Sequence, residues 1–124
     1  MNDFGKALEL HLKSITDRNL PAFSKFLHPS VDCIVILPNG HMIKGHENIL
    51  KFHESWFEDS DWRMDANVLD TFVDENVGYA LLDVVYHDLD ESNNPYEMEY
   101  FLSLLFTKMD NKWILVRDQN TLKQ

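Results

Sequence analysis

The stretch "VGYALLDVVYHDLDESNNPYEMEYFLSLLFTKMDNKWILVRDQNT", residues 77–121, decides the fold class. It contains three apolar runs rich in β-branched and aromatic residues, which are typical of β-strands. Two short polar segments, 91–95 and 110–112, separate the runs and have the composition of turns. We therefore expect three consecutive strands, over residues 77–90, 96–109 and 113–121, joined as antiparallel hairpins.

The residues before this stretch predict helices first and further strands after them. Apolar residues at helical spacing predict helices over residues 3–18, 19–28 and 46–57. Strands are expected over residues 31–38, 42–44 and 62–68. The alternation of the last of these changes face at Val68-Leu69, which predicts a β-bulge. This order of elements favours an α+β fold, in which a curved antiparallel sheet carries the helices on its concave face.

Length and composition restrict the classes of protein to consider. The 124 residues are most simply one domain, residues 1–124, and 44% are hydrophobic, enough for a substantial core. A formal charge of −10 argues against a nucleic-acid or anionic-membrane partner, since both require basic residues. The single cysteine, Cys33, cannot form an internal disulfide, which favours the cytoplasm. The first ten residues lack the pattern of a signal peptide, and no segment approaches the roughly 20 apolar residues of a membrane span.

Within the first predicted hairpin, "ALLDVVYHD" (80–88) contains a carboxylate, Asp83, with two apolar residues on each side. An ionised aspartate in an apolar interior is costly unless it is paired or hydrogen-bonded. In a structural interpretation, Asp83 has a hydrogen-bonding partner or pairs with Arg117 on a dimer face. In a functional interpretation, it lies in an apolar pocket beside Asp118 or His87. Burial and a neighbouring like charge would then raise its pKa toward neutrality, as suits a general acid or base.

Four segments together resemble one family over nearly the whole chain. They are "DRNLPAFSKFLHPSVDCIV" (17–35), "IKGHENI" (43–49), "YALLD" (79–83) and "DNKWILVRDQNT" (110–121). The pattern is similar to the nuclear transport factor two-like superfamily, also called ketosteroid isomerase-like or polyketide cyclase-like. It most resembles the small stand-alone members grouped near the association domain of calcium/calmodulin-dependent kinase two. The resemblance implies a cone, or cystatin-like roll, with a pocket at its open end and a homodimer joined through the sheet.

The resemblance also implies which strand residues point into the cone. Carried over through "YALLD" and "NKW", the pocket positions of the association-type members are Asp83, Leu104 and Asn120. Strand alternation then adds further inward residues. These are Leu81, Val85, His87, Leu102, Phe106, Val116 and Asp118. The assignment depends on register, because a shift of one residue exchanges the two faces of a strand.

Two departures from the family argue against a steroid isomerase mechanism. The catalytic aspartate of ketosteroid isomerases would fall in "IVILPNG" (34–40), where Ile36 or Leu37 takes its place. The acid that donates to the substrate oxygen would fall in "YFLSLLF" (100–106), which offers Ser103 or leucines. The apolar site is retained, and both of the acids that such a site would tune are missing.

Other residues add candidates on the third helix and the strands. His53 and Trp56 lie on the inward face of the helix over 46–57, and Tyr86 and Tyr100 are candidate ligand contacts. His46 and His53 lie two helical turns apart, roughly 10 Å at 1.5 Å per residue, too far to share one zinc ion. We therefore expect no metal and no cofactor.

Three functions remain compatible with the sequence. The first is a small-molecule-binding protein with a largely apolar pocket, a buried acid and a small apolar ligand that has a polar head. The second is a cofactor-free isomerase, cyclase or dehydratase with Asp83 and His87 as its catalytic residues. The third is a dimerisation module whose own side chains fill the pocket. The predicted ligand-binding residues are Asp118, Asn120, Leu104, Phe106, Trp56, His53 and Tyr100.

Overall fold

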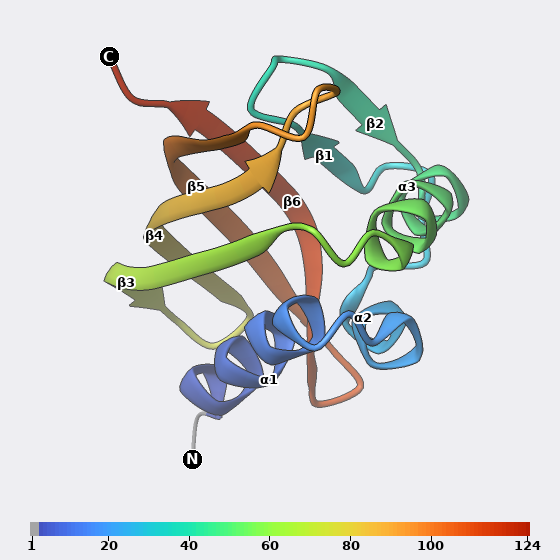
Figure 1. The fold of residues 1–124 in the computed structure, drawn as a ribbon. Helices are drawn as coiled ribbons and strands as arrows, with labels where there is room; N and C mark the ends of the chain where they lie inside the picture. Colours follow the sequence, from blue (N-terminus) through green and yellow to red (C-terminus); the bar gives the residue numbers. More distant parts are fainter. Residues whose placement is uncertain (1–2) are drawn as a thin grey trace.

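The computed structural model describes residues 3–124, in which three helices and six strands follow the predicted order (Figure 1). The helices are α1 (Phe4–Thr16), α2 (Leu20–Phe26) and α3 (His46–Glu58). The strands are β1 (Ile34–Ile36), β2 (Met42–Lys44), β3 (Arg63–Val73), β4 (Val77–Leu89), β5 (Pro95–Met109) and β6 (Lys112–Leu122). The predicted strand over 31–38 is therefore shorter than expected. A turn occupies its start, where the Asp32 amide donates to Ser30 Oγ at 2.9 Å.

The strands form one curved sheet in the order β2-β1-β6-β5-β4-β3. The three predicted hairpin strands, β4, β5 and β6, are antiparallel neighbours, and β1 pairs with β6 in parallel. The register of β3 shifts between Val68 and Asp70, which confirms the predicted bulge. The helices lie on one side of the bent sheet (Figure 1). This architecture confirms the α+β prediction.

Local sequence explains how the helices begin and which side they bury. The Asn19 side chain caps α2 by accepting from the Ala22 amide at 3.1 Å, and Pro21 occupies the first turn. Helix α1 turns Leu8, His11 and Ile15 into the core. Among residues 3–124, no helix combines the length and apolar character needed to cross a bilayer.

The inner face of β4 carries its even-numbered residues. Ala80, Leu82, Val84 and Tyr86 are buried against the helices and the rest of the core. Gly78 belongs to the same face, and a Cβ there would lie 2.4 Å from the Phe4 ring, so only glycine lets α1 approach this closely. The odd-numbered residues of β4 lie on the opposite side of the sheet, called here the outer face.

This register corrects the predicted inward set of β4 by one residue. Leu81, Asp83, Val85 and His87 were expected inside the cone, and the structure places them on the half-buried outer face. The prediction was wrong because both faces of β4 are apolar at the centre of the strand, so hydrophobic alternation could not choose between them. The close packing of Phe4 on Gly78, five residues before Asp83, fixes the choice.

Candidate functional site

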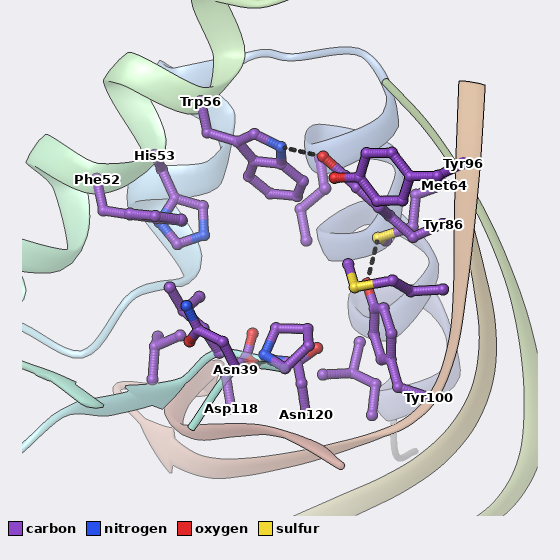
Figure 2. A pocket seen from close by; sticks show the side chains of 16 residues that line it. Asn39, Phe52, His53, Trp56, Met64, Tyr86, Tyr96, Tyr100, Asp118 and Asn120 are labelled. Atoms are coloured by element: carbon purple, nitrogen blue, oxygen red, sulfur yellow. Dashed lines mark hydrogen bonds between the residues drawn. The ribbon is translucent and has the colours of Figure 1, made fainter. Parts of the chain in front are cut away.

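A cavity of about 360 Å³ occupies the interior of the cone between α3, the inner face of β3–β6 and the turn that joins β1 to β2 (Figure 2). Most of the sixteen side chains that line it are apolar or aromatic. They are Ile15, Val35, Leu37, Pro38, Asn39, Phe52, His53, Trp56, Met64, Tyr86, Tyr96, Met98, Tyr100, Leu102, Asp118 and Asn120. We call this space the cone cavity.

Hydrogen bonds and stacking fix the aromatic wall of the cone cavity. Trp56 on α3 stacks on Trp62 with ring centroids 4.2 Å apart, and its Nε1 donates to the Tyr86 hydroxyl at 3.2 Å. The Tyr86 hydroxyl in turn donates to Asp88 Oδ2 at 2.7 Å. Burial, together with this hydrogen bond, raises the pKa of Tyr86, so its hydroxyl is neutral. The wall is thus held in place before any ligand enters.

Two further tyrosines of β5 lie on the same side of the cone cavity (Figure 2). The Tyr100 hydroxyl donates to Met64 Sδ at 3.7 Å, and burial and the nearby Asp118 carboxyl raise the pKa of Tyr100. Tyr96 is 40% exposed. Burial also raises the pKa of Tyr96, and the carboxylates of Asp88, Asp90 and Asp59 add to that effect. Both phenols are therefore neutral, and Asp88 lies opposite the more exposed one in the β4–β5 pairing.

Asp118 is the acid of the cone cavity. It lies on β6 opposite Val35 of the parallel neighbour β1, and it is only 7% exposed. Burial raises the pKa of Asp118 to about 7, although a hydrogen bond from Asn120 acts in the opposite direction. Asn120 Nδ2 donates to Asp118 Oδ1 at 3.0 Å and to the Ile36 carbonyl at 2.7 Å. Both amide hydrogens are used, so Asn120 positions Asp118.

His53 lies across the cone cavity from Asp118 (Figure 2). Its Nδ1 is 2.8 Å from the Ile49 carbonyl, and its ring stacks on Phe23 with centroids 4.1 Å apart. Burial lowers the pKa of His53 to about 4, so the ring is neutral at pH 7. A carbonyl can only accept, so Nδ1 carries the hydrogen and Nε2 keeps a free lone pair.

The structure brings five of the predicted site residues together. His53, Trp56, Tyr100, Asp118 and Asn120 all line the cone cavity. The other two predicted ligand-binding residues, Leu104 and Phe106, point inward and are fully buried in the core, outside the cavity lining. Phe106 packs there against Phe4 with ring centroids 5.4 Å apart.

Asp83 does not line the cone cavity, contrary to expectation. Its carboxylate lies on the outer face, where Lys123 Nζ is 2.8 Å from Oδ1, and its side chain is 34% exposed. Arg117, the partner suggested by the structural interpretation, instead donates to the Asp32 carbonyl at 2.6 Å. Asp83 is thus paired with a cation on the outer face and partly exposed, so its negative charge is compensated without any contribution from the cone cavity.

His87 lies on the outer face as well. Its Nε2 is 3.2 Å from Asp65 Oδ2 and its Nδ1 is 3.1 Å from Glu97 Oε2. The side chain is 30% exposed, and strand β4 separates it from the interior of the cone. The expected pairing of His87 with Asp83 inside one pocket is therefore wrong, for the same reason of register.

Sequence reasoning missed several residues of the cone cavity. Met64, Met98 and Tyr96 line it without having been candidates. The signal was present for two of them, because Tyr96 and Met98 continue the inward alternation of Tyr100 toward the start of β5. Within residues 3–124, no group of three histidine, cysteine, aspartate or glutamate side chains is arranged to hold a metal ion.

No protein-family model and no curated protein matches this sequence. Solved structures match at low identity. A nuclear transport factor 2 (NTF2-like) superfamily protein from Salmonella enterica is 14% identical, with a TM-score of 0.79, over 98% of this chain and 89% of that one. A ketosteroid isomerase-like protein from Erwinia carotovora atroseptica is 13% identical, with a TM-score of 0.78, over 97% and 93%.

The association domain of C. elegans CaMKII is 15% identical, with a TM-score of 0.68, over 95% of this chain and 92% of that domain. At these identities the likeness concerns the fold, and it agrees with the curved sheet and the helices on one side of it. The chain therefore has the NTF2-like, ketosteroid isomerase-like fold.

Proposed function

We propose that this protein binds a small molecule in the cone cavity, and that the ligand has a largely apolar body and one polar head. The observation that carries the proposal is Asp118, a buried acid on the wall of an open cavity lined mostly by apolar and aromatic side chains. In this proposal Asp118 takes the role of the pocket acid that was predicted for Asp83 from the sequence.

The open volume favours a ligand over a purely structural module. Small-molecule sites commonly enclose roughly 300–1,000 Å³, and the cone cavity, at about 360 Å³, lies at the lower end of that range. A module that serves only for dimerisation is expected to fill this space with its own side chains. Burying a carboxylate without a charged partner lowers the stability of the fold. A ligand that contacts Asp118 gives a reason for the protein to keep such a residue.

A second candidate function is a cofactor-free enzyme of the isomerase, cyclase or dehydratase type. It is favoured by the pKa of Asp118, which at about 7 suits a group that gives or takes a proton at neutral pH. The free lone pair of His53 Nε2 supplies an acceptor on the opposite wall. In this mechanism Asp118 would transfer the proton, His53 would hold a substrate hydroxyl, and Asn120 would orient Asp118.

We also propose a homodimer joined through the outer face of the sheet. That face presents apolar side chains from three adjacent strands, among them Leu81, Leu105 and Ile114, which one chain leaves only half-buried, and Phe101, which is 37% exposed. Contiguous apolar surface of this kind is typical of an interaction site. The likeness to an association domain supports this assembly. Light scattering should then give twice the chain mass of 14.6 kDa, and Leu105→Arg should give the single mass.

A thermal-shift screen tests the binding proposal. Small aromatic and aliphatic compounds with neutral, anionic or cationic heads are added to the wild type, to Asp118→Asn and to Asp83→Asn. Ligands that bind the folded state raise its melting temperature by mass action. We expect hits whose identity or strength changes in Asp118→Asn and is kept in Asp83→Asn, the matched control on the outer face. Hits that respond equally to both substitutions, or no hits from any class, would contradict the proposal.

A further inference from the structure

We propose, building on the proposed ligand site, that the cone cavity takes an organic cation. The ligand is a small aryl or alkyl ammonium whose charged head lies against the Asp118 carboxylate and whose hydrocarbon part packs on the aromatic walls. The inference rests on the charges around Asp118, on the kind of side chain that lines the cavity, and on the acidic surroundings of Tyr96.

Residues 3–124 place no compensating positive charge beside Asp118. None of the sixteen described lining residues is a lysine or an arginine. The titratable groups that face Asp118 come from α3, β5 and the segment before β1: they are His53, Tyr100 and the Cys33 thiol. Burial keeps each of them neutral at pH 7. Arg117, the neighbour of Asp118 on β6, points to the outer side and donates to the Asp32 carbonyl.

Five aromatic rings line the cone cavity. Phe52, Trp56, Tyr86, Tyr96 and Tyr100 all line the same cavity of about 360 Å³ (Figure 2). The face of an aromatic ring carries partial negative charge and attracts ammonium groups, most strongly where water is excluded. Rings that surround one carboxylate form an environment that favours a cation and disfavours an anion.

The more exposed part of the cavity, at Tyr96, has an acidic environment. Asp88 lies opposite Tyr96 in the β4–β5 pairing, and Asp61 and Glu97 line one surface hollow together with these two residues. Burial raises the pKa of Tyr96, and the carboxylates of Asp88, Asp90 and Asp59 raise it further. The whole chain carries a formal charge of −10. Such a field concentrates cations at the cavity and slows the approach of anions.

Proton linkage separates a cationic ligand from a neutral one. A cation binds the ionised form of Asp118, so its affinity must rise as the pH increases through about 7. The ionised fraction grows roughly tenfold between pH 6 and pH 8 for a group with this pKa, and the affinity should grow by the same factor. A neutral ligand that accepts a hydrogen bond from the protonated carboxyl shows the opposite trend.

The test is calorimetric titration of the whole chain with matched pairs of probes. Choline is compared with 3,3-dimethylbutan-1-ol, which has the same shape without the charge, and benzylammonium with benzyl alcohol; benzoate is the anionic probe. We expect each cation to bind at least roughly tenfold more tightly than its neutral match at pH 8, as ring and carboxylate contacts each contribute. Asp118→Asn should remove most of this preference, whereas Asp83→Asn should keep it.

The outcomes distinguish a failure of the cation inference from a failure of the proposed ligand site. If neutral probes bind as tightly as their cationic matches, or if the affinity for choline does not change with pH, the cation inference is wrong and the ligand site remains. If no probe and no compound of the wider screen binds, both proposals are wrong. Should Asp118→Asn fail to fold, the pH dependence of the wild type still gives the answer.

Discussion

Replacing Asp118 by asparagine should change how the stability of this protein depends on pH. Asparagine has nearly the same shape, and its side-chain oxygen can still accept the hydrogen bond that Asn120 Nδ2 donates at 3.0 Å. The substitution therefore removes the ionisable group and retains most of the packing. Any difference between the two proteins that varies with pH then reports the ionisation of Asp118.

The sign and size of the effect follow from the pKa. Burial raises the pKa of Asp118 from 3.8 to about 7, so the folded state holds a proton that the unfolded state has already lost. Stability contributed by the protonated carboxyl is present at low pH and is lost as the pH rises from 3.8 to about 7. Each tenfold difference in proton affinity corresponds to about 1.4 kcal/mol. The free energy of unfolding of the wild type should therefore fall by up to about 4 kcal/mol over this range through Asp118 alone. Roughly 3 kcal/mol of this decrease should come between pH 5 and pH 8.

Urea denaturation of both proteins at pH 5, 6, 7 and 8 measures this difference. His11 and His53 also change stability with pH, but they are present in both proteins, so their contributions cancel in the difference. The free energy of unfolding of Asp118→Asn minus that of the wild type should increase by roughly 3 kcal/mol from pH 5 to pH 8. Stability curves that stay parallel within about 0.5 kcal/mol would refute the claim that Asp118 is buried without a charged partner.

The remaining predictions concern packing and the outer face. Gly78→Ala should destabilise the fold by about 1–3 kcal/mol, because its Cβ would lie 2.4 Å from the Phe4 ring. Gly5→Ala should be neutral or slightly stabilising, because a Cβ there has no atom within 4 Å. Urea denaturation of both variants compares the two effects. His11→Leu should raise the melting temperature, since neither ring nitrogen of this fully buried histidine has a hydrogen-bond partner among the described residues. The extra stability of His11→Leu over the wild type should grow by about 2 kcal/mol from pH 7 to pH 5. Burial lowers the pKa of His11 from 6.5 to about 3, so the unfolded wild type gains a proton as the pH falls below 6.5 and the folded wild type does not. A stability difference that does not change with pH would contradict this. Asp83→Asn should leave ligand affinities unchanged in calorimetry, and a loss of binding comparable to that of Asp118→Asn would show that the outer face contributes to the site.

Most of the architecture could be predicted because the decisive signals are local. The two turns at 91–95 and 110–112 delimit the hairpin strands, and the helical spacing in 3–18 and 46–57 identifies α1 and α3. Asn19 and Pro21 mark the start of α2. Each of these features depends on neighbours within a few residues, which a sequence displays directly.

The register of β4 could not be predicted because it depends on a distant contact. Leu81 and Val85 on one face are as apolar as Leu82 and Val84 on the other, so the hydrophobic pattern does not show which face is buried. The choice follows from the packing of α1 on Gly78, more than sixty residues away along the chain.

Asp118 and Asn120 were assigned to the inner face through the resemblance, and the structure places them there. The polar run at residues 117–120 gives no alternation of its own, and continuing the alternation of Trp113 and Leu115 would have turned Arg117 inward. The register shift opposite Leu105 and Phe106 brings Asp118 inward instead. What the sequence does not reveal is that Asp118 lacks a charged partner. That property depends on side chains from α3, β5 and the segment before β1, which meet only in the folded cone.

The measurement that tests the central claim most directly is a ¹³C NMR titration of the aspartate side-chain carboxyls, with the Asp118 resonance assigned by comparison with Asp118→Asn. We predict that Asp118 titrates near pH 7, and that choline or benzylammonium moves its midpoint to lower pH by stabilising the carboxylate. A midpoint near 3.8 that no cation shifts would mean that Asp118 is solvated or already paired, and the proposed site would then be wrong.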